Sequence, residues 1–528
     1  MTGAGARAAA HDGPRASWLA AGAVAAVAAL PLVYVLVRAA GAGADTWSGL
    51  LDRRIPDLLA NTIGLALAVC AGTLLIGTSL AWLVVRTDLP GRRALGVLCA
   101  LPLAIPPYVG AVAYADVLGP RGALRDLLGV ESLPSIFGFF GATLVLVVFT
   151  YPYVFLLASA ALHNLNPSYE EAARALGRGW VRTLAGTTAR LIVPALAGGT
   201  LLVGLYVLSD FGAVSLMRFD TFTTVIYAEL GGRFDPPGAA ALSSVLVVLT
   251  LLLLASGLAV RGRGRYEQTG AGFARSSTRE LGRGRWAAFA FVAAVLGLAL
   301  VLPLARLVTW TLDSAAGGSL GDYAGWTWNS LSVSFLAATV ATVCALPVAV
   351  VMARSRARGG IVVGWLAQAG YALPGVIVAL ALVAISTRWF DPLYGTLGLL
   401  VAAFVIRFLP QAIQAEEAGL QQIGRNLTEA ARALGASRAS AFRRVVLPLL
   451  GPSLAASWAV VFLTAAKELP ATLVLRPLGF DTLPVRVWTP ARDGLYADAG
   501  PAALLLVLIS LVPLALLLIR RRGAALSL

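Results

Sequence analysis

Long apolar stretches separated by short polar ones run along almost the whole chain. Segments with few or no charged residues lie at 16–37, 58–85, 94–115, 134–162, 191–209, 238–260, 287–309, 329–352, 360–387, 392–415, 445–466 and 499–519. Each can form a helix across a hydrocarbon layer about 30 Å thick, which takes roughly 20 apolar residues. The pattern therefore predicts an all-α polytopic membrane protein with about 12 transmembrane helices.

Composition agrees with this pattern and narrows the class of protein. The chain has 528 residues, of which 59% are hydrophobic and 13% charged, with a mean hydropathy of +0.82. A soluble protein of this size needs more charged surface, so we expect the lipid bilayer to cover much of the chain. The net charge of +15 resembles that of nucleic-acid-binding proteins, but the arginines cluster between apolar segments, as in cytoplasmic loops. We therefore expect no nucleic-acid partner.

The arginine clusters also predict the orientation of the helices. If the N-terminus is cytoplasmic, the arginine-rich loops at 86–93, 174–190 and 354–358 and the tail at 520–522 all lie on the cytoplasmic side. Positive charge concentrates on that side in membrane proteins, so both termini are expected to be cytoplasmic. The first apolar segment is too long for a typical signal sequence and has no obvious cleavage site, so we expect it to be retained as a helix.

A polar stretch at 261–285 divides the chain into two parts of similar length. It holds seven arginines and two glutamates among glycines and serines, which is typical of a flexible cytoplasmic linker. We expect a first transmembrane half at 1–260 and a second at 286–528.

An internal repeat relates the two parts. The string EAARALG occurs at 171–177 and again at 429–435, 258 residues later. The same offset pairs Pro152 with Pro410, Pro194 with Pro452, Asp210 with Glu468 and Arg218 with Arg476. Upstream the offset is 268, and it pairs Asn61 with Asn329 and Pro106 with Pro374. The sequence thus predicts two parallel six-helix halves, with ten extra residues in an outer loop of the first half around 116–131.

Each EAARALG string lies in an inner loop between the fourth and fifth predicted helices of its half. It joins strong helix formers to a glycine, and glycine readily takes the left-handed conformation that ends a helix. Each copy therefore predicts a short helix followed by a turn. A plain amphipathic connecting loop is the alternative interpretation.

These strings resemble the EAA loop of binding-protein-dependent ABC importer permeases, in which Glu-Ala-Ala, three residues, Gly and nine residues precede Ile-x-Leu-Pro. The second copy fits, with Val-Val-Leu-Pro at 445–448, whereas the first copy has Thr-Thr-Ala-Arg at 187–190. The resemblance implies a type I importer fold in the bacterial inner membrane. It also implies an extracytoplasmic substrate-binding protein and two coupling helices that dock on a homodimeric ATP-binding cassette ATPase. The coupling residues it indicates are Glu171, Ala172, Ala173, Gly177, Glu429, Ala430, Ala431 and Gly435.

Several chemistries are missing from the sequence. No G-x-x-x-x-G-K-[ST] string occurs, so ATP hydrolysis is expected from another polypeptide and the chain is not expected to be an enzyme. Cys70, Cys99 and Cys344 lie in apolar segments without metal-ligand spacing, and His11 and His163 are the only histidines. We expect no catalytic group, no resident metal and no cofactor.

Two further stretches resemble the ferric-iron branch of the family. They are 208–216 with 219–224, and 467–473 with 480–483. Related fused permeases for thiamine and 2-aminoethylphosphonate share parts of these strings, and a polyamine is another alternative cargo. An ion-gradient-driven secondary transporter is the less favoured alternative, because paired EAA loops would have no role in it.

Charged residues at the ends of the predicted fifth helices are candidates for the translocation path. Asp210 and Glu468 occupy equivalent positions, and an ionisable group at membrane depth is costly unless something offsets it. We expect the pair to line the path near its outer gate, with Lys467 balancing one carboxylate. The alternative is that both carboxylates cap helices or form surface ion pairs. Arg407 interrupts another apolar segment; we expect its side chain to extend to the cytoplasmic end, and the alternative is that it faces the pore.

Overall fold

The structure, a computed structural model, is a helical protein. It describes residues 15–120, 122–166, 168–177, 179–229, 236–262, 279–313, 319–355 and 358–526. Within these ranges there is no β-strand, and one isolated β-bridge joins Thr87 and Arg279. Most of the expected linker at 261–285 lies outside the described residues.

Nine spans among the described residues are long and apolar enough to cross a membrane. They are α1 (Arg15–Ala40), α3 (Ile55–Arg86), α7 (Phe139–His163), α10 (Ala189–Ser209), α13 (Pro236–Gly262), α14 (Gly284–Leu296) continued by α15 (Leu302–Asp313), α16 (Leu320–Arg354), α19 (Leu397–Gln422) and α22 (Leu447–Ala466). Each covers one of the twelve predicted segments, and α25 (Tyr496–Leu526) covers the last. The prediction of an all-α polytopic membrane protein is confirmed.

The third predicted helix of each half is not continuous. In the first half α4 (Arg92–Leu98) and α5 (Pro107–Leu118) belong to segments that meet at 93°, and in the second half α17 (Arg358–Ala367) and α18 (Gly375–Trp389) are likewise separate. Pro106 and Pro374 are extended at the start of α5 and α18, with ψ of 137° and 149°. Proline also disfavours helical conformation in the residue before it. The prediction of single helices at 94–115 and 360–387 is therefore wrong.

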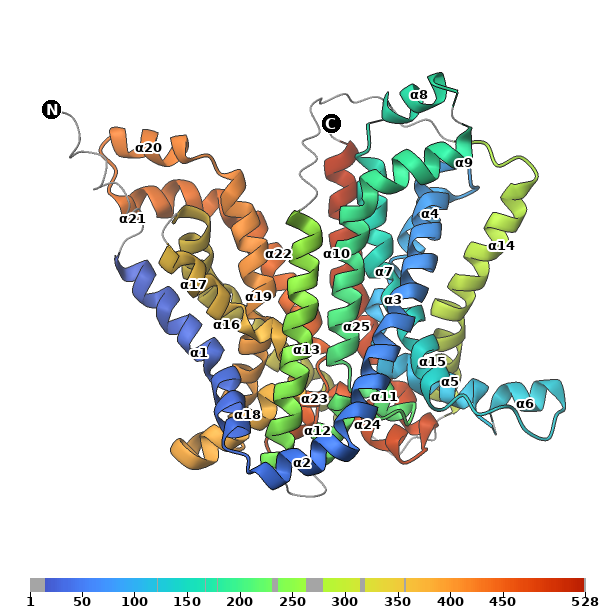
Figure 1. Ribbon diagram of the computed structural model, residues 1–528, viewed down its shortest axis with the longest axis horizontal. Helices are drawn as coiled ribbons and strands as arrows, with labels where there is room; N and C mark the ends of the chain where they lie inside the picture. The colour runs from blue at the N-terminus through green and yellow to red at the C-terminus, as the bar shows by residue number, and fades with distance from the viewer. Residues whose placement is uncertain are drawn as a thin grey trace.

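Short helices connect the long ones. They are α2 (Ala44–Arg53), α6 (Ala123–Leu128), α8 (Ser168–Ala175), α9 (Trp180–Thr183), α11 (Gly212–Leu216), α12 (Phe222–Ala228), α20 (Arg425–Ala433), α21 (Arg438–Ala441), α23 (Pro470–Leu475) and α24 (Leu483–Arg492). Helix α6 forms within the loop that we expected to be longer in the first half, and it projects from the body of the protein (Figure 1).

The two halves repeat their hydrogen bonds as well as their helices. The Asn61 side chain on α3 donates to the carbonyl oxygen of Asp220 (3.1 Å), and Asn329 on α16 donates to that of Asp481 (2.9 Å). In each half this bond ties a long helix to the loop before α12 or α24. The offset of 268 that pairs Asn61 with Asn329 in the sequence therefore marks a structural equivalence.

Close packing of small residues holds the long helices of each half together. Helix α3 packs along α7, and α16 packs along α19. A Cβ atom on Gly77 of α3 would lie 2.9–3.0 Å from Val154 and the backbone of Tyr151 and Phe155. Only glycine allows this approach, which is a common means of helix association in membranes.

In each half, the first helix also packs against the other half. Helix α1 packs on α16, α17 and α18 of the second half, while α15 packs on α5 of the first half (Figure 1). The Tyr114 hydroxyl on α5 donates to the carbonyl oxygen of Leu298 (3.1 Å), and Arg306 on α15 forms an ion pair with Asp116 (2.5 Å). Leu298 lies in a π-helical turn, η4 (Gly297–Val301), between α14 and α15.

The two EAA segments lie at one end of the protein. Helices α8 and α20 are at the top in Figure 1, whereas α6, α12 and α24 are toward the bottom. Helix α1 begins, and α25 ends, toward the end that carries α8 and α20 (Figure 1).

Candidate functional site

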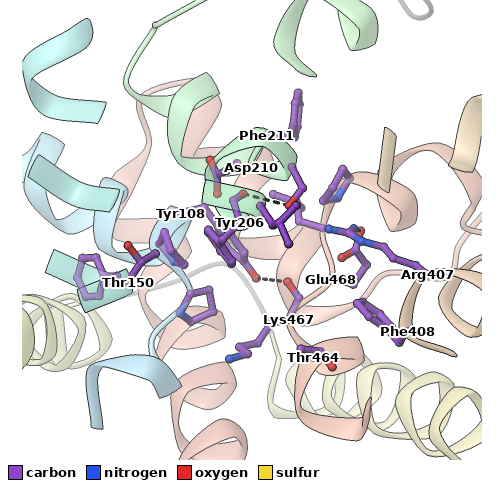
Figure 2. A pocket seen from close by; sticks show the side chains of 18 of the residues that line it. Tyr108, Thr150, Tyr206, Asp210, Phe211, Arg407, Phe408, Thr464, Lys467 and Glu468 are labelled. Carbon is purple, nitrogen blue, oxygen red and sulfur yellow. Dashed lines mark hydrogen bonds and ion pairs between the residues drawn. The ribbon is translucent and has the colours of Figure 1, made fainter. Parts of the chain in front are cut away.

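A cavity of about 230 Å³ lies between the two halves. The first half lines it with residues of α5, α7, α10 and α11, and the second half with residues of α19, α22 and α23. Asp210, Lys467 and Glu468, which the sequence singled out, all line this cavity, and so does Arg407 (Figure 2). Residues from distant parts of the chain thus converge on one polar site at the interface.

Asp210 joins α10 to the short helix α11. Its backbone leaves the helical conformation with a ψ of 133°. The carboxylate Oδ1 accepts hydrogen bonds from the backbone N–H groups of Ala213 (3.0 Å) and Val214 (3.1 Å). Thr223 Oγ1 donates to the carbonyl oxygen of Asp210 (2.6 Å). Although Asp210 is only 7% exposed, the free N–H groups at the start of α11 offset part of its desolvation.

Glu468 has the equivalent role between α22 and α23. Its Oε1 accepts a hydrogen bond from the Ala471 N–H (3.2 Å), and Thr472 Oγ1 donates to the Glu468 carbonyl oxygen (2.8 Å). Both carboxylates therefore cap short helices, as the alternative interpretation held. They also line the cavity, so capping and a place on the path are compatible.

The Arg407 side chain does not extend to either end of its helix. It lies 10 residues after Leu397 and 15 before Gln422, so each end of α19 is roughly 15–22 Å away at 1.5 Å per residue. Instead, its guanidinium Nη1 forms an ion pair with Glu468 Oε1 (Figure 2). The expectation that Arg407 extends to the cytoplasmic end is wrong. Both ends of the helix are out of its reach, whereas the carboxylate of Glu468, 61 residues later in the sequence, is within reach.

A glycine makes room for this ion pair. A Cβ atom on Gly375, at the start of α18, would lie 2.1 Å from Arg407 Nη1 and 2.5 Å from Glu468 Oε1. Any larger residue at this position would displace one of the two charged groups. The break between α17 and α18 therefore also shapes the cavity.

Lys467 contacts the first half rather than a carboxylate. Its ammonium Nζ donates to the carbonyl oxygen of Leu103 (3.0 Å), and its own carbonyl oxygen accepts from the Tyr108 hydroxyl (3.4 Å). Leu103 lies in η1 (Leu101–Ala104), within the break before α5. The expectation that Lys467 balances a carboxylate is wrong, because Arg407 has that role for Glu468.

Three tyrosines of the first half complete the polar lining, and sequence reasoning missed them. Tyr108, Tyr153 and Tyr206 all line the cavity, and the rings of Tyr153 and Tyr206 lie 6.2 Å apart. Tyr206 precedes Asp210 by four residues, the spacing that places two side chains on one face of a helix. That spacing was visible in the sequence, whereas the partners on α5 and α7 were not.

A resident metal site does not form in the part of the chain that the structure describes. No three His, Cys, Asp or Glu side chains gather there in a way that could hold a metal ion. Cys70, Cys99 and Cys344 are free and lie apart from the cavity lining.

The two EAA segments form the short helices that the sequence predicts. Helix α8 contains Glu171, Ala172 and Ala173, and α20 contains Glu429, Ala430 and Ala431. The helices are followed by Gly177 and Gly435, with positive φ of 77° and 90°. The prediction of a helix followed by a left-handed glycine is confirmed.

Both EAA helices present apolar surface to their surroundings. The leucine before each glycine is almost fully exposed, Leu176 at 81% and Leu434 at 90%, and both glutamates are exposed. The helices that these leucines follow, α8 and α20, lie at the opposite end of the molecule from α12 and α24 (Figure 1). Two equivalent helices therefore offer the same exposed residues at the same end of the protein.

Comparison with known proteins agrees with this arrangement. The family described as "binding-protein-dependent transport system inner membrane component" matches residues 74–263 and 345–522, one match in each half. The chain belongs to this family. It is therefore a multi-pass inner-membrane permease that works with an ATPase and a substrate-binding protein, and ATP hydrolysis resides in another polypeptide. Family membership sets aside the secondary transporter as an alternative.

Named relatives cover the permease to different extents. The Fe(3+)-transport system permease protein FbpB 2 of Haemophilus influenzae is 32% identical over 92% of this chain and 95% of its own length. The ferric transport system permease protein FbpB of Actinobacillus pleuropneumoniae is 25% identical over 82% of this chain and 67% of its own. The sulfate transport system permease protein CysW of Escherichia coli is 29% identical over 42% of this chain and 80% of its own.

Proposed function

We propose that this permease imports ferric iron delivered by an extracytoplasmic binding protein. The observation that carries the proposal is the likeness to a ferric permease across both halves, over 92% of this chain and 95% of that relative. The sulfate permease relatives cover less than half of the chain. Thiamine, 2-aminoethylphosphonate and polyamines are the cargoes against which ferric iron has to be tested.

The EAA helices are proposed to couple the permease to a homodimeric ATP-binding cassette ATPase. Glu171 and Glu429 would offer charge-assisted contacts, and the small Ala172, Ala173, Ala430 and Ala431 would let the two backbones approach. Gly177 and Gly435 would set the turns. Support comes from the exposure of both glutamates and of Leu176 and Leu434. Closing of the ATPase dimer would draw the two helices together and rock the halves between inward and outward states.

This proposal includes an orientation and a division of the chain. Because the ATPase is cytoplasmic, α8 and α20 would face the cytoplasm, and so would both termini. The start of α1 and the end of α25 lie toward the same end as α8 and α20, which supports this orientation (Figure 1). We propose halves at 1–260 and 286–528, joined by a cytoplasmic linker at 261–285.

The cavity is proposed to be part of the translocation path, with Asp210, Lys467 and Glu468 near its outer gate. Ferric iron is a hard cation that favours oxygen ligands, and carboxylate and phenol oxygens line the cavity. Two acidic groups face two basic ones, Arg407 and Lys467, so the lining has little net charge. The two basic groups would weaken the binding of a ferric ion to these oxygen atoms. Transport requires such weak binding, because the ion has to leave the site again.

The cargo is tested by measuring which solute the cognate binding protein retains, followed by uptake into proteoliposomes. The proteoliposomes contain this chain with its ATPase, and the binding protein is added outside. We expect ATP-dependent uptake of ferric iron, with no competition from excess thiamine, 2-aminoethylphosphonate or spermidine. Retention of one of these solutes and no ferric uptake would refute the cargo assignment while leaving the importer class intact.

Two sets of variants test the site residues. Glu171→Ala with Glu429→Ala is expected to abolish co-purification of the ATPase and uptake together. Asp210→Asn with Glu468→Gln is expected to lower uptake at least about tenfold while the ATPase stays bound, because each change removes a charge from the cavity. Unchanged uptake in the second variant would exclude both carboxylates from the path.

A further inference from the structure

Both coupling loops return to the membrane through a π-helical turn. The turns are η2 (Leu184–Thr188) before α10 and η7 (Phe442–Val446) before α22, again 258 residues apart. π-Turns occur mostly as single turns and often at functional sites. The last residue of each turn is buried, Thr188 at 1% exposure and Val446 at 0%. These two residues anchor the coupling loops, and they differ in chemistry.

The second loop rests on apolar packing. Val446 forms a small buried cluster with Ala349, Leu420 and Leu450, from α16, α19 and α22. On α20, the position 258 residues after Glu170 is Thr428, whose buried hydroxyl makes no hydrogen bond. The anchor of the second loop is therefore hydrophobic.

The first loop has a polar anchor at the same place. Glu170, the counterpart of Thr428, accepts hydrogen bonds at Oε1 from Thr188 Oγ1 (2.7 Å) and from Arg86 Nη2 (2.5 Å). Arg86 is the last residue of α3, and it is only 4% exposed. Its other terminal nitrogen, Nη1, makes no hydrogen bond. A charge-assisted bond thus ties the coupling helix α8 to α3, with the buried charge of Arg86 offset by Glu170.

The chain that enters the second half contacts both the end of α3 and the first coupling loop. The Arg279 N–H donates to the Arg86 carbonyl oxygen (2.9 Å), and the Leu281 N–H donates to Asp88 Oδ1 (2.8 Å). The Arg279 guanidinium also lies 3.4 Å from the centre of the Trp180 ring on α9. At that distance a cation–π contact adds to the backbone bonds.

Trp180 contacts two other segments although it is 39% exposed. Its ring centre lies 5.6 Å from that of Trp82 on α3, and the Arg279 guanidinium lies over its ring. The residue at the equivalent position of the second loop is Arg438, which has no aromatic ring. Three residues after Leu281 the chain starts α14, which is continued by α15, the helix that packs on α5 of the first half.

We infer that Arg86, Glu170 and Arg279 are positioning residues that clamp the first coupling loop to α3 and to the start of the second half. At the equivalent place in the second loop, Val446 packs in an apolar cluster. The inference rests on the proposed coupling role of the EAA helices. It gives the first loop a charge-assisted link between α8 and α3, at a place where the second loop has apolar packing.

Hydrogen–deuterium exchange tests the clamp itself without cargo or ATPase. In the purified full chain, Glu170→Gln is expected to speed exchange in 168–190 about tenfold, equal to ~1.4 kcal/mol, and to leave 425–448 unchanged. Arg279→Gln is a milder second variant and is expected to act on the same segment. Asp126→Asn, which removes an exposed ion pair with Arg125 on α6, is the matched control and should change neither segment. Equal exchange in 168–190 for wild type and both clamp variants would overturn the inference.

The functional readout is the amount of cargo carried per ATP hydrolysed by the reconstituted complex, with ferric citrate as the probe. We expect this ratio to fall about five- to tenfold for Glu170→Gln while the amount of bound ATPase stays constant. A merely structural role would lower the amount of complex and keep the ratio, which would refute positioning. If Glu171→Ala with Glu429→Ala leaves the ATPase bound, the proposed coupling function fails, whatever the exchange data show for the clamp.

Discussion

The buried ion pair between Arg407 and Glu468 allows a quantitative prediction. In Arg407→Met, the Glu468 carboxylate keeps the hydrogen bond from the Ala471 N–H but loses its only opposite charge among the described contacts. Removing one member of a buried pair typically costs about 3–5 kcal/mol. Glu468 is 6% exposed and lines a cavity of about 230 Å³, which has room for water, so we expect the low end, about 3 kcal/mol.

A double-mutant cycle isolates this interaction. Replacing both members of a buried pair by uncharged groups is often nearly neutral, so Arg407→Met with Glu468→Gln should be more stable than Arg407→Met alone. We expect an interaction energy of about 1.5–3 kcal/mol, measured by equilibrium unfolding in mixed micelles. Asp210→Asn serves as the matched control, because its carboxylate accepts hydrogen bonds from backbone N–H groups and forms no ion pair among the described contacts. Effects of Arg407→Met and Glu468→Gln that add within about 0.5 kcal/mol would refute the reasoning.

Three further substitutions test other parts of the structure by the same unfolding measurement. Gly375→Ala should lower the free energy of unfolding by about 1–3 kcal/mol, because its Cβ would separate the cavity ion pair. Gly451→Ala on α22 is the control: its Cβ meets nothing within 4 Å, so it should be neutral or stabilise by up to about 1 kcal/mol. Equal effects of the two substitutions would argue against the steric explanation. Arg306→Gln should cost about 1 kcal/mol and be non-additive with Asp116→Asn, because this partly exposed pair joins the halves. Asn329→Ala should cost about 1–2 kcal/mol through loss of its hydrogen bond to the backbone, and no loss would mean that the loop is held without it.

Hydropathy predicted the long helices well because lipid imposes one requirement on all of them. A spanning helix needs a continuous apolar run, and nine of the predicted segments are such helices in the described residues. The third segment of each half is equally apolar, yet it breaks at Pro106 or Pro374. Hydropathy averages over a window and cannot register a backbone reversal, whereas the prolines themselves were readable signals.

Chemical type identified some site residues, but it could not identify their partners. Asp210, Lys467 and Glu468 stood out as charges in apolar surroundings, and they do line one cavity. The partner of Glu468 is Arg407, on a different helix, and that of Lys467 is a backbone carbonyl oxygen in the other half. Backbone acceptors carry no signal in the sequence, and the pairing of charges depends on helix packing that no local pattern encodes.

The positions related by the repeat are of two kinds, those that hold the backbone and those that line the cavity. This difference bears on how the permease could select its cargo. Where the backbone is held, the halves use the same chemistry: Asn61 and Asn329 bind a loop, and Asp210 and Glu468 cap a helix. At four other pairs of cavity-lining positions, the offset of 258 pairs unlike residues: Phe149 with Arg407, Tyr153 with Gln411, Tyr206 with Thr464 and Ser209 with Lys467.

At these four pairs, the first half supplies three aromatic rings and a hydroxyl group, and the second half supplies two cationic groups, an amide and a hydroxyl group. Equal scaffolds allow the halves to rock as a pair, because matched bonds hold matched segments. On the proposed translocation path, a cargo in this cavity would therefore meet different chemistry on its two sides. Exchanging Tyr206 and Thr464 would keep the overall composition of the cavity lining while moving one phenol group from the first half to the second. If the linings work as two distinct surfaces, that exchange should reduce uptake even though the scaffold bonds at Asp210 and Glu468 remain.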